Sequence, residues 1–489
     1  MSETIPVEPG VARVSDRRAV LPAIRGFDLR LGDGLAMGSP RLAQLGEQWR
    51  FDDTAGGVRW LGTLIGSGRP VVDAGAALVL AGELYNREDI GRALGEDVHG
   101  VPDPELVLAL WHRYHLGALR LLNGRYALVL AHRGRVIVAT DHAGSVPLYV
   151  AVGADGMHVA TEAKALYAKG LGPQQVAAGT AQVVEGGTRR TILTWQPPQG
   201  RRIVSGDEAV AELRHRLGRA VAARCPSTVR PTVVLSGGID SSTVTALAAG
   251  LCGGARTVSL GTDAGDEFAA ARVVADHLGT EHEEITIDSR TLIDDLAWTV
   301  WAAEITDPDV LEYLLPLVAL YRRLPGPARR ILTGYGADIP LGGMHRDTVD
   351  LGTLDAVLAT DMATFDGLNE MCPALSGFAG HWSTHPFWDR DVLDFLVGLE
   401  PGLKRRGGTD KWVLREAFRD LLPPSTVGRR KLGIHEGSGT TSTWTKVLLA
   451  AGVPAGRVRE AKLAQATRLH HRLVIGGEHP ADRVWGLAG

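Results

Sequence analysis

The sequence predicts two parts: an α+β domain with antiparallel sheets over residues 1–200, and an α/β domain with a parallel sheet over residues 201–489. In the first part, short apolar runs flank glycine-containing turns, which is typical of β-hairpins. In the second part, runs rich in β-branched residues alternate with helical stretches, which is typical of a parallel sheet. Between them, residues 195–202 (WQPPQGRR) are rich in Pro, Gly and Gln without periodicity, which indicates a linker.

Length and composition agree with a multidomain globular protein. The chain has 489 residues, too many for one ordinary hydrophobic core, so two or three domains are expected. Its formal net charge is −4 and it has no basic run, so a nucleic-acid partner is not indicated. The N-terminus lacks a basic-then-apolar signal and no stretch is long and apolar enough to span a bilayer, which favours a cytoplasmic protein without a membrane partner. The sequence leaves a homodimer open.

The three cysteines, Cys225, Cys252 and Cys372, lie far apart and lack the spacing of a metal site. In a cytoplasmic protein such cysteines are normally reduced. We therefore expect three free thiols.

The first part contains hairpins and one well-marked helix. Strands are expected at residues 77–81, at 126–131 and 135–140 around the turn 132–134, and at 148–152 and 157–161 around the turn 153–156. The helix begins at Asp103, expected as its cap, with Pro104 at the first helical position and apolar residues at helical spacing behind. Hairpins with one or two helices give an α+β domain.

The second part opens with a helix that starts at Ser205 or Asp207, and then carries the most informative stretch of the chain. Residues 232–235 form an expected buried strand, residues 236–238 (SGG) a turn, and residues 241–249 a helix. This geometry aims free backbone N–H groups and the positive helix end at an anion. The glycines let a phosphate approach, and Asp240 is placed to hold a cation beside it. The alternative is a tight turn without a ligand.

Two further strand–turn units follow. A strand at 256–262, a helix at 267–278 and a strand at 283–287 form a βαβ unit, whose ligands lie at the carboxyl ends of the strands. Residues 329–332 are a third strand, which runs into the glycine-rich turn before Asp338. Asp338 and Asp240 then project from neighbouring strand ends, where two carboxylates can hold Mg²⁺. Taken alone, an Asp after Gly-x-Gly is normally a turn residue.

Residues 236–242 (SGGIDSS) resemble the pyrophosphate-binding loop of the ATP pyrophosphatases, which include asparagine synthetase. They do not match a Walker loop, because no Gly-Lys-Ser/Thr follows. The resemblance implies that ATP, with Mg²⁺, is cleaved between its α and β phosphates and that AMP is attached to a substrate oxygen. The nucleotide-binding residues that it implies are Val234, Ser236, Gly237, Gly238, Asp240, Ser241, Ser242, Ser259, Leu260, Gly334 and Lys411.

Three strings of the first part, residues 82–86 (GELYN), 123–126 (NGRY) and 141–149 (DHAGSVPLY), resemble the glutaminase domain of asparagine synthetase, an N-terminal-nucleophile fold. That domain uses a cysteine directly after the initiator methionine as its nucleophile. Here Ser2 stands in that position, and the first cysteine is Cys225. We expect a domain that has kept its packing and lost ammonia production; the alternative is that Ser2 is a nucleophile.

Residues 333–343 (TGYGADIPLGG), 361–370 (DMATFDGLNE) and 430–439 (RKLGIHEGSG) resemble the β-lactam synthetases of clavulanic acid and carbapenam biosynthesis. This similarity spans nearly the whole chain. It implies that a β-amino acid carboxylate is adenylated and that the amine of the same molecule then closes a four-membered ring. In the implied roles, Tyr335 oriented by Glu370 takes the amine proton, Lys431 stabilises the oxyanion, and Lys411 meets the released phosphates.

The small-molecule substrate implied by the resemblance is N2-(2-carboxyethyl)-L-arginine, whose guanidinium needs a carboxylate partner. Asp361 and Asp366 are the candidates. Residues 435–442 are expected to form a flexible loop that closes over the site. Further residues expected on the substrate side are Tyr313, Gly336 and Asp338, with Glu312 either beside them or in helix packing.

Other interpretations of these three residues remain open. Tyr335 can be a packed turn residue, Glu370 part of a solvated helix face, and Lys431 part of a surface basic cluster. Two other functions also compete: an asparagine synthetase-like amide ligase that uses ammonia or an external amine, and a non-catalytic homologue. The latter is disfavoured because every residue that the chemistry needs is present.

Overall fold

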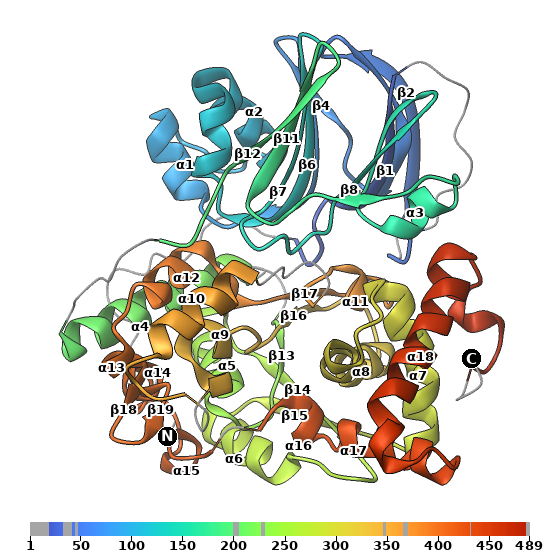
Figure 1. The fold of residues 1–489 in the computed structure, drawn as a ribbon. Coiled ribbons are helices and arrows are strands. Elements are labelled where there is room, and N and C mark those ends of the chain that lie inside the picture. Colours follow the sequence, from blue (N-terminus) through green and yellow to red (C-terminus); the bar gives the residue numbers. More distant parts are fainter. Residues whose placement is uncertain are drawn as a thin grey trace.

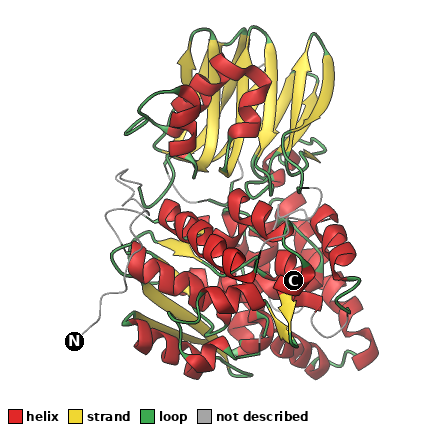
Figure 2. Ribbon diagram, turned by 90° about the vertical axis from the view of Figure 1, so that its left-hand side faces the viewer, coloured by secondary structure: helices red, strands yellow, loops and turns green. Residues whose placement is uncertain are grey.

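The structure is a computed structural model that describes residues 19–32, 42–44, 47–198, 205–225, 230–345, 349–364, 370–430 and 432–485. Figure 1 shows two stacked parts, an upper part built mainly from strands and a lower part in which helices surround a sheet. Figure 2 shows the same division from the side, with the strands of the upper part standing almost upright over the helices of the lower part.

The upper part is a sandwich of two six-stranded sheets, whose strand pairs are all antiparallel. One sheet has the order β10 (Gln174–Gln175), β8 (Tyr149–Gly153), β9 (Gly156–Ala160), β1 (Ile24–Leu31), β3 (Val58–Gly66), β2 (Gln48–Ala55). The other has the order β12 (Thr188–Leu193), β11 (Thr180–Glu185), β7 (Arg135–Thr140), β6 (Gly124–His132), β5 (Ala76–Leu84), β4 (Val71–Asp73).

Strand β5 shows why this sequence makes a sandwich with helices on one side. Its residues Ala77 and Val79 face the core between the two sheets, whereas Leu78 and Leu80 face the core under helices α1 (Arg87–Leu94) and α2 (Asp103–Tyr114). Successive side chains of a strand point to opposite faces, so a continuous apolar run fits a strand buried on both sides. The predicted strands and the predicted helix of this part are confirmed.

The predicted cap of helix α2 is wrong. Pro102 occupies the cap position, and Asp103 is the first residue of the helix. Its carboxylate instead accepts a hydrogen bond from the backbone N of Leu84 at 2.8 Å and pairs with Arg87, so it links the helix to strand β5.

The lower part contains a five-stranded parallel sheet in the order β15 (Glu281–Ile287), β14 (Arg256–Thr262), β13 (Thr232–Val234), β16 (Arg330–Leu332), β17 (Trp382–Thr384). The main helices around it are α4 (Gly206–Arg224), α5 (Ile239–Leu251), α6 (Phe268–Leu278), α7 (Ser289–Ala303) and α8 (Pro308–Arg323). Figure 1 shows α4 and α5 on one side of the central strands and α7 and α8 on the other. The predicted α/β class is confirmed, and Ser205 caps α4 by accepting from the N of Glu208 at 3.2 Å.

The central strands are buried on both faces, in agreement with their β-branched composition. Val233 and Leu332 belong to the core with α4 and α5, whereas Val234 and Ile331 belong to the core with α7 and α8. The remaining elements are α3 (Ala163–Tyr167), α9 (Asp338–Leu341), α10 (Leu354–Thr364), α11 (Ala374–Gly377), α12 (Arg390–Val397), α13 (Pro401–Lys404), β18 (Arg405–Arg406), β19 (Thr409–Asp410), α14 (Trp412–Ala417), α15 (Pro424–Val427), α16 (Ile434–Gly437), α17 (Thr440–Ala450) and α18 (Val458–His470).

Buried charged pairs join the two parts. Glu83 of β5 accepts from the Arg330 guanidinium at 2.6 and 2.9 Å, and from the Trp382 indole at 3.0 Å. At another point of the same interface, Lys164 lies 2.6 Å from Glu162 and 3.1 Å from Glu304. Pairs of this kind are costly to break from one side, because the remaining charge stays buried.

The expectation of three free thiols is wrong. Cys225 and Cys252 form a disulfide, with Cα atoms 5.8 Å apart, and Cys372 is a buried free thiol. Cys225 follows the last residue of α4 and Cys252 the last residue of α5, and these two helices pack against each other. The pairing therefore depends on tertiary packing, which the spacing of 27 residues does not reveal.

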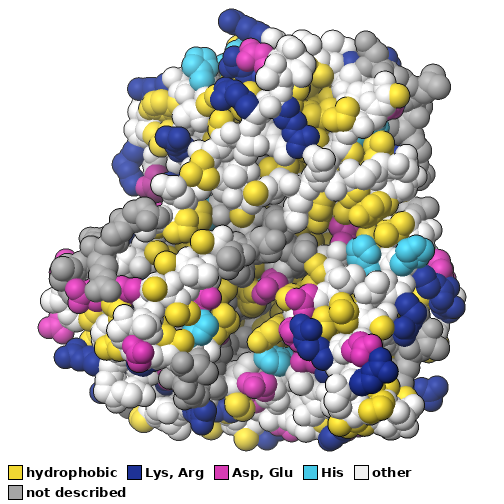
Figure 3. Space-filling model, in the orientation of Figure 1, with side chains coloured by type: hydrophobic (Ala, Val, Ile, Leu, Met, Phe, Trp, Pro, Cys, Tyr) yellow, Lys and Arg dark blue, Asp and Glu magenta, His cyan; other side chains and the backbone are white. Residues whose placement is uncertain are grey.

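Among the described helices, none has both the length and the apolar content that crossing a bilayer requires. On the face shown in Figure 3, Lys and Arg side chains are scattered among acidic and apolar ones.

Candidate active site

The phosphate loop, residues 236–242, connects strand β13 to helix α5. Gly237 has a φ of 72°, and a Cβ there would lie 2.4 Å from the backbone carbon of Ala270. Only glycine fits this position without moving the neighbouring helix. The Ser241 hydroxyl accepts from the N of Ser236 at 3.2 Å, and the Ser242 side chain is fully buried with no hydrogen-bond partner for its hydroxyl among the described residues.

A charged triad, formed by Lys411, Asp240 and Asp338, lies directly beside this loop. The Lys411 Nζ atom is 2.7 and 2.6 Å from the two carboxylate oxygens of Asp240, and 2.7 Å from Oδ1 of Asp338. Lys411 has an exposed fraction of 0%. Burial lowers the pKa of its ammonium group, and the nearby charge of Asp240 opposes that effect. The two aspartates that the sequence places at neighbouring strand ends therefore converge on one point.

Glycine at position 343 makes room for the triad. A Cβ on Gly343 would lie 2.1 Å from Oδ1 of Asp338 and 2.7 Å from Cε of Lys411. Any other side chain would displace the lysine or the carboxylate.

Tyr335 and Glu370 form a hydrogen-bonded pair. Tyr335 lies in the turn after strand β16, and its hydroxyl donates to Oε2 of Glu370. Burial raises the pKa of Glu370 to about 7, and the negative charge of Asp307 adds to this effect. A carboxylate with such a pKa can accept and release a proton near neutral pH.

The turn that carries Tyr335 lies against the phosphate loop. A Cβ on Gly334 would lie 2.5 Å from the N of Ser241, so glycine permits this close approach. Gly336 has a φ of 92°, and a Cβ there would overlap the Trp388 indole. Gly334 thus lets the turn of Tyr335 lie against the phosphate loop, and Gly336 lets it lie against Trp388.

Three predicted nucleotide contacts lie in β13 and β14: Val234 is the last residue of β13, whereas Ser259 and Leu260 lie in the middle of β14. Val234 and Leu260 are buried. The Ser259 hydroxyl donates to the carbonyl of Leu235 and lies 3.3 Å from Nε2 of His282, so its hydrogen bonds are made within the sheet. Their contact with a nucleotide remains a prediction.

The predicted substrate residues have varied surroundings. The Asp361 carboxylate is 2.6 Å from Nε2 of His345, a residue that the sequence analysis did not single out. Tyr313 is 41% exposed, and its ring centroid is 3.9 Å from that of His435. Glu312 accepts from the Thr441 hydroxyl at 2.8 Å and pairs with Lys462, so helix packing is its observed role.

The predicted flexible loop at residues 435–442 is wrong. These residues belong to the short helix α16, a turn and the start of α17. The Ser438 carbonyl accepts from the Thr262 hydroxyl at 2.6 Å, and the Thr440 side chain is buried. Ser438 and Gly439 form the turn between the two helices.

Ser2, Asp366 and Lys431 lie outside the described residues. The segment just before Lys431 is nevertheless bound to the site. Arg429 donates to the carbonyl of Ser236 at 2.9 Å and pairs with Glu267 at 2.8 Å. The sequence signal for Arg429 was its place two residues before Lys431.

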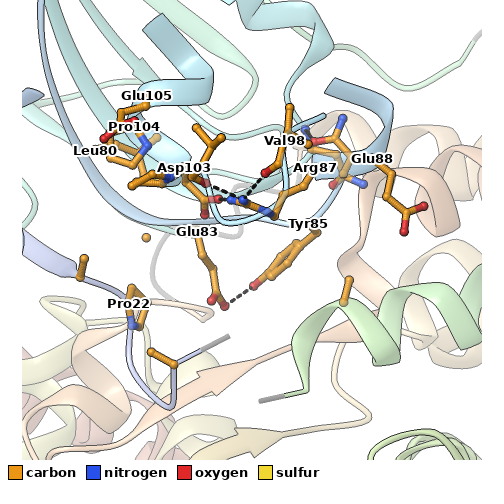
Figure 4. A pocket seen from close by; sticks show the side chains of 18 of the residues that line it. Pro22, Leu80, Glu83, Tyr85, Arg87, Glu88, Val98, Asp103, Pro104 and Glu105 are labelled. Atoms are coloured by element: carbon orange, nitrogen blue, oxygen red, sulfur yellow. Dashed lines mark hydrogen bonds and ion pairs between the residues drawn. The ribbon is translucent and has the colours of Figure 1, made fainter. Parts of the chain in front are cut away.

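A cleft of about 970 Å³ lies between the two parts, away from the phosphate loop and the tyrosine pair (Figure 4). In Figure 4 Glu83 and Tyr85, which line the cleft, point toward each other, and Arg87 lies against Asp103; the Tyr85 hydroxyl donates to Oε1 of Glu83 at 3.0 Å. Among the described residues that line it, none is a predicted site residue. The tyrosine pair and the charged triad therefore form a separate site.

Comparison with known proteins assigns families to both parts. Residues 212–366 and 380–488 match the asparagine synthase family, and residues 63–168 match the glutamine amidotransferase domain. These matches confirm the predicted fold classes of the two parts, while the domain bounds 1–200 and 201–489 remain predictions.

Three curated relatives indicate the branch of the family. The carboxyethyl-arginine beta-lactam-synthase of Streptomyces clavuligerus is 51% identical over 492 residues, which cover 95% of this chain and 96% of that protein. The glutamine-hydrolyzing asparagine synthetase B of Escherichia coli is 26% identical over 74% of this chain and 70% of its own. Asparagine synthetase 2 of Arabidopsis thaliana is 27% identical over 75% and 68%. The predicted resemblance to β-lactam synthetases is confirmed, and the chain belongs to the asparagine synthase family of ATP-dependent, amide-forming ligases.

Proposed function

We propose that this protein is an ATP- and Mg²⁺-dependent β-lactam synthetase whose substrate is N2-(2-carboxyethyl)-L-arginine. The observation that carries the proposal is the hydrogen-bonded Tyr335–Glu370 pair beside the phosphate loop. A ligase that uses free ammonia has no need of a base for an amine tethered to its own acyl-adenylate. The substrate is that of the 51% identical relative's name, carried over to this chain.

In the proposed first step, a carboxylate oxygen of the substrate attacks the α-phosphorus of ATP and pyrophosphate leaves. The backbone N–H groups of residues 236–238 and the hydroxyls of Ser241 and Ser242 bind the leaving phosphates. Val234, Ser259, Leu260 and Gly334 contact the adenosine.

The residues at the charged triad fit Mg²⁺. Asp240 and Asp338 supply carboxylate oxygens, the ligand type that this ion prefers. Oxygens of both carboxylates lie within 2.7 Å of the same atom, Nζ of Lys411, so the two side chains are close enough to bind one ion. No group of three or more metal-ligating side chains occurs among the described residues, so phosphate oxygens and water would complete the coordination. When bound, the ion neutralises phosphate charge. Lys411 then meets the released pyrophosphate.

In the proposed second step, the secondary amine attacks the acyl carbon of the adenylate, forms the ring C–N bond and expels AMP. The amine proton passes to the Tyr335–Glu370 pair, and Lys431 stabilises the oxyanion of the tetrahedral intermediate. Asp361 and Asp366 pair with the substrate guanidinium, with Tyr313, Gly336 and Asp338 along its path.

The sandwich has a different role in this proposal. We assign no ammonia production to Ser2 or to the domain of residues 1–200. The synthetase domain spans residues 201–489. A cytoplasmic location is part of the proposal because the reaction consumes ATP.

Incubation with ATP, Mg²⁺ and carboxyethyl-arginine tests the proposal by mass spectrometry. We expect a product that has lost one water, together with AMP and pyrophosphate. ADP in place of AMP would contradict adenylation. A product that gains the mass of ammonia or of an added amine, less one water, would instead support the asparagine synthetase-like alternative.

A further inference from the structure

One arginine of the sandwich contacts the residue next to Glu370 and the strand beside the one that leads to Tyr335. Arg125 lies on strand β6 and is only 3% exposed. Its Nη1 donates to the carbonyl of Ser383, and its Nη2 donates to the carbonyl of Met371. The guanidinium carbon also lies 4.9 Å from the centroid of the Trp382 ring. One planar group therefore binds the backbone carbonyls of two separate segments.

The Met371 carbonyl belongs to the residue next to Glu370. Met371 is buried and packs in the same cluster as Tyr335 and Trp388. A bond to the Met371 carbonyl restricts the backbone from which the Glu370 side chain projects.

The Ser383 carbonyl is connected to Tyr335 through strands β17 and β16. Ser383 is the central residue of β17, which pairs with β16, and the N of Thr333 donates to the carbonyl of Thr384 at 3.1 Å. The Thr333 hydroxyl is 2.7 Å from Nδ1 of His385 and accepts from the N of Tyr335 at 3.2 Å.

His385 adds a rigid contact to this connection. Its ring is buried, and its centroid lies 5.5 Å from that of Tyr335. Burial, with the charges of Arg125 and Arg224, keeps its pKa far below the usual range, so the ring is neutral. It therefore supports Tyr335 by packing and by its bond to Thr333.

We propose that Arg125 is a positioning residue that sets Tyr335 against Glu370, so that the sandwich serves ring closure by geometry. This inference rests on the proposed function of the pair. A guanidinium is a rigid fork of donors, which fixes the separation of the two carbonyls that it binds. Because proton transfer depends on the distance between donor and acceptor, loosening one segment slows ring closure while adenylation at the phosphate loop continues.

Arg125→Met and Arg125→Lys test this role against simple adhesion between the two parts. Lys164→Met is the matched control, because Lys164 is also a buried cation at this interface and contacts Glu162, Glu304 and the Trp301 carbonyl. For each variant, substrate-dependent exchange of pyrophosphate into ATP reports adenylation. Single-turnover formation of the lactam reports ring closure, and thermal melting reports stability.

We expect Arg125→Met to slow ring closure by up to about 100-fold, the scale of an ångström misplacement, with pyrophosphate exchange nearly unchanged. Arg125→Lys keeps the charge but not the fork, so its ring closure stays below wild type. Lys164→Met is expected to lower the melting temperature without changing the ratio of the two rates. Equal losses in both half-reactions for Arg125→Met, or a changed ratio in Lys164→Met, would overturn the inference.

The same measurements distinguish two further outcomes. If Arg125→Met does not fold, the ratio in Arg125→Lys decides, and an unaltered ratio contradicts the role. If wild-type protein exchanges pyrophosphate but forms no lactam, the proposed function fails, whereas an active wild type with an unaffected Arg125→Met contradicts only the positioning role.

Discussion

Tyr335 and Asp338 lie close together on one short turn, yet the charged groups that they contact have opposite surroundings: burial disfavours charge on both Lys411 and Glu370, but among the described residues only Lys411 has partners of opposite charge. Asp240 and Asp338 share the buried ammonium of Lys411, which offsets part of their negative charge. Glu370 has a phenol hydroxyl as its hydrogen-bond partner and the carboxylate of Asp307 nearby, so burial raises its pKa to about 7. One part of the turn is therefore built to hold charged groups and the other to exchange protons.

The largest effect is expected where the charged triad is broken. Lys411→Met leaves the buried Asp240 carboxylate and the partly buried Asp338 carboxylate without their cation, which costs up to about 3–5 kcal/mol of unfolding free energy. It should also abolish pyrophosphate exchange. Chemical denaturation and the exchange assay measure both effects. Combining it with Asp240→Asn and Asp338→Asn should restore stability but not activity; a triple variant as unstable as Lys411→Met would contradict charge balance as the cause.

Lys431→Ala should lower kcat by at least about 100-fold, the scale for losing an oxyanion partner. Steady-state lactam formation measures this. Near-normal turnover would rule out the role of Lys431 in ring closure.

Tyr335→Phe removes the hydroxyl that donates to Glu370 and should slow ring closure by about 100-fold, with a smaller effect on adenylation. Rapid-quench detection of the acyl-adenylate and of the lactam separates the two steps. If pyrophosphate exchange falls as much as ring closure, Tyr335 is a binding residue.

Glu370 should make both activity and stability depend on pH. Ring closure is expected to rise with pH through about 7, because only the ionised form takes a proton. The raised pKa means that the folded protein retains a proton that the unfolded chain loses near 4.5, so unfolding free energy should fall by up to about 3 kcal/mol as pH rises to about 7. Glu370→Gln should slow ring closure and flatten both profiles. A wild-type profile without a transition near 7 would contradict this assignment.

Ser259→Ala is expected to have the smallest effect. Its hydroxyl bonds within the sheet, so the KM for ATP should change little while unfolding free energy falls by about 1 kcal/mol. A large rise in KM would show that the hydroxyl binds the nucleotide.

Most of the fold and part of the site could be predicted from local sequence patterns. The strand and turn around residues 232–242 and the strand at 256–262 were predictable because their signals are contiguous. The disulfide of Cys225 and the contacts of Arg125 were not, because both join segments that meet only after the domains pack. The helices at 434–450 were missed because glycine and serine were taken as signs of a loop, whereas burial of Thr440 and Trp444 decides the structure there.

The most direct test of the central claim follows the oxygen atoms of the substrate. Carboxyethyl-arginine labelled with oxygen-18 in its β-carboxylate should yield AMP that carries one labelled oxygen and a lactam that keeps the other, because the carboxylate attacks the α-phosphorus. Unlabelled AMP, or label found in inorganic phosphate released together with ADP, would contradict the account.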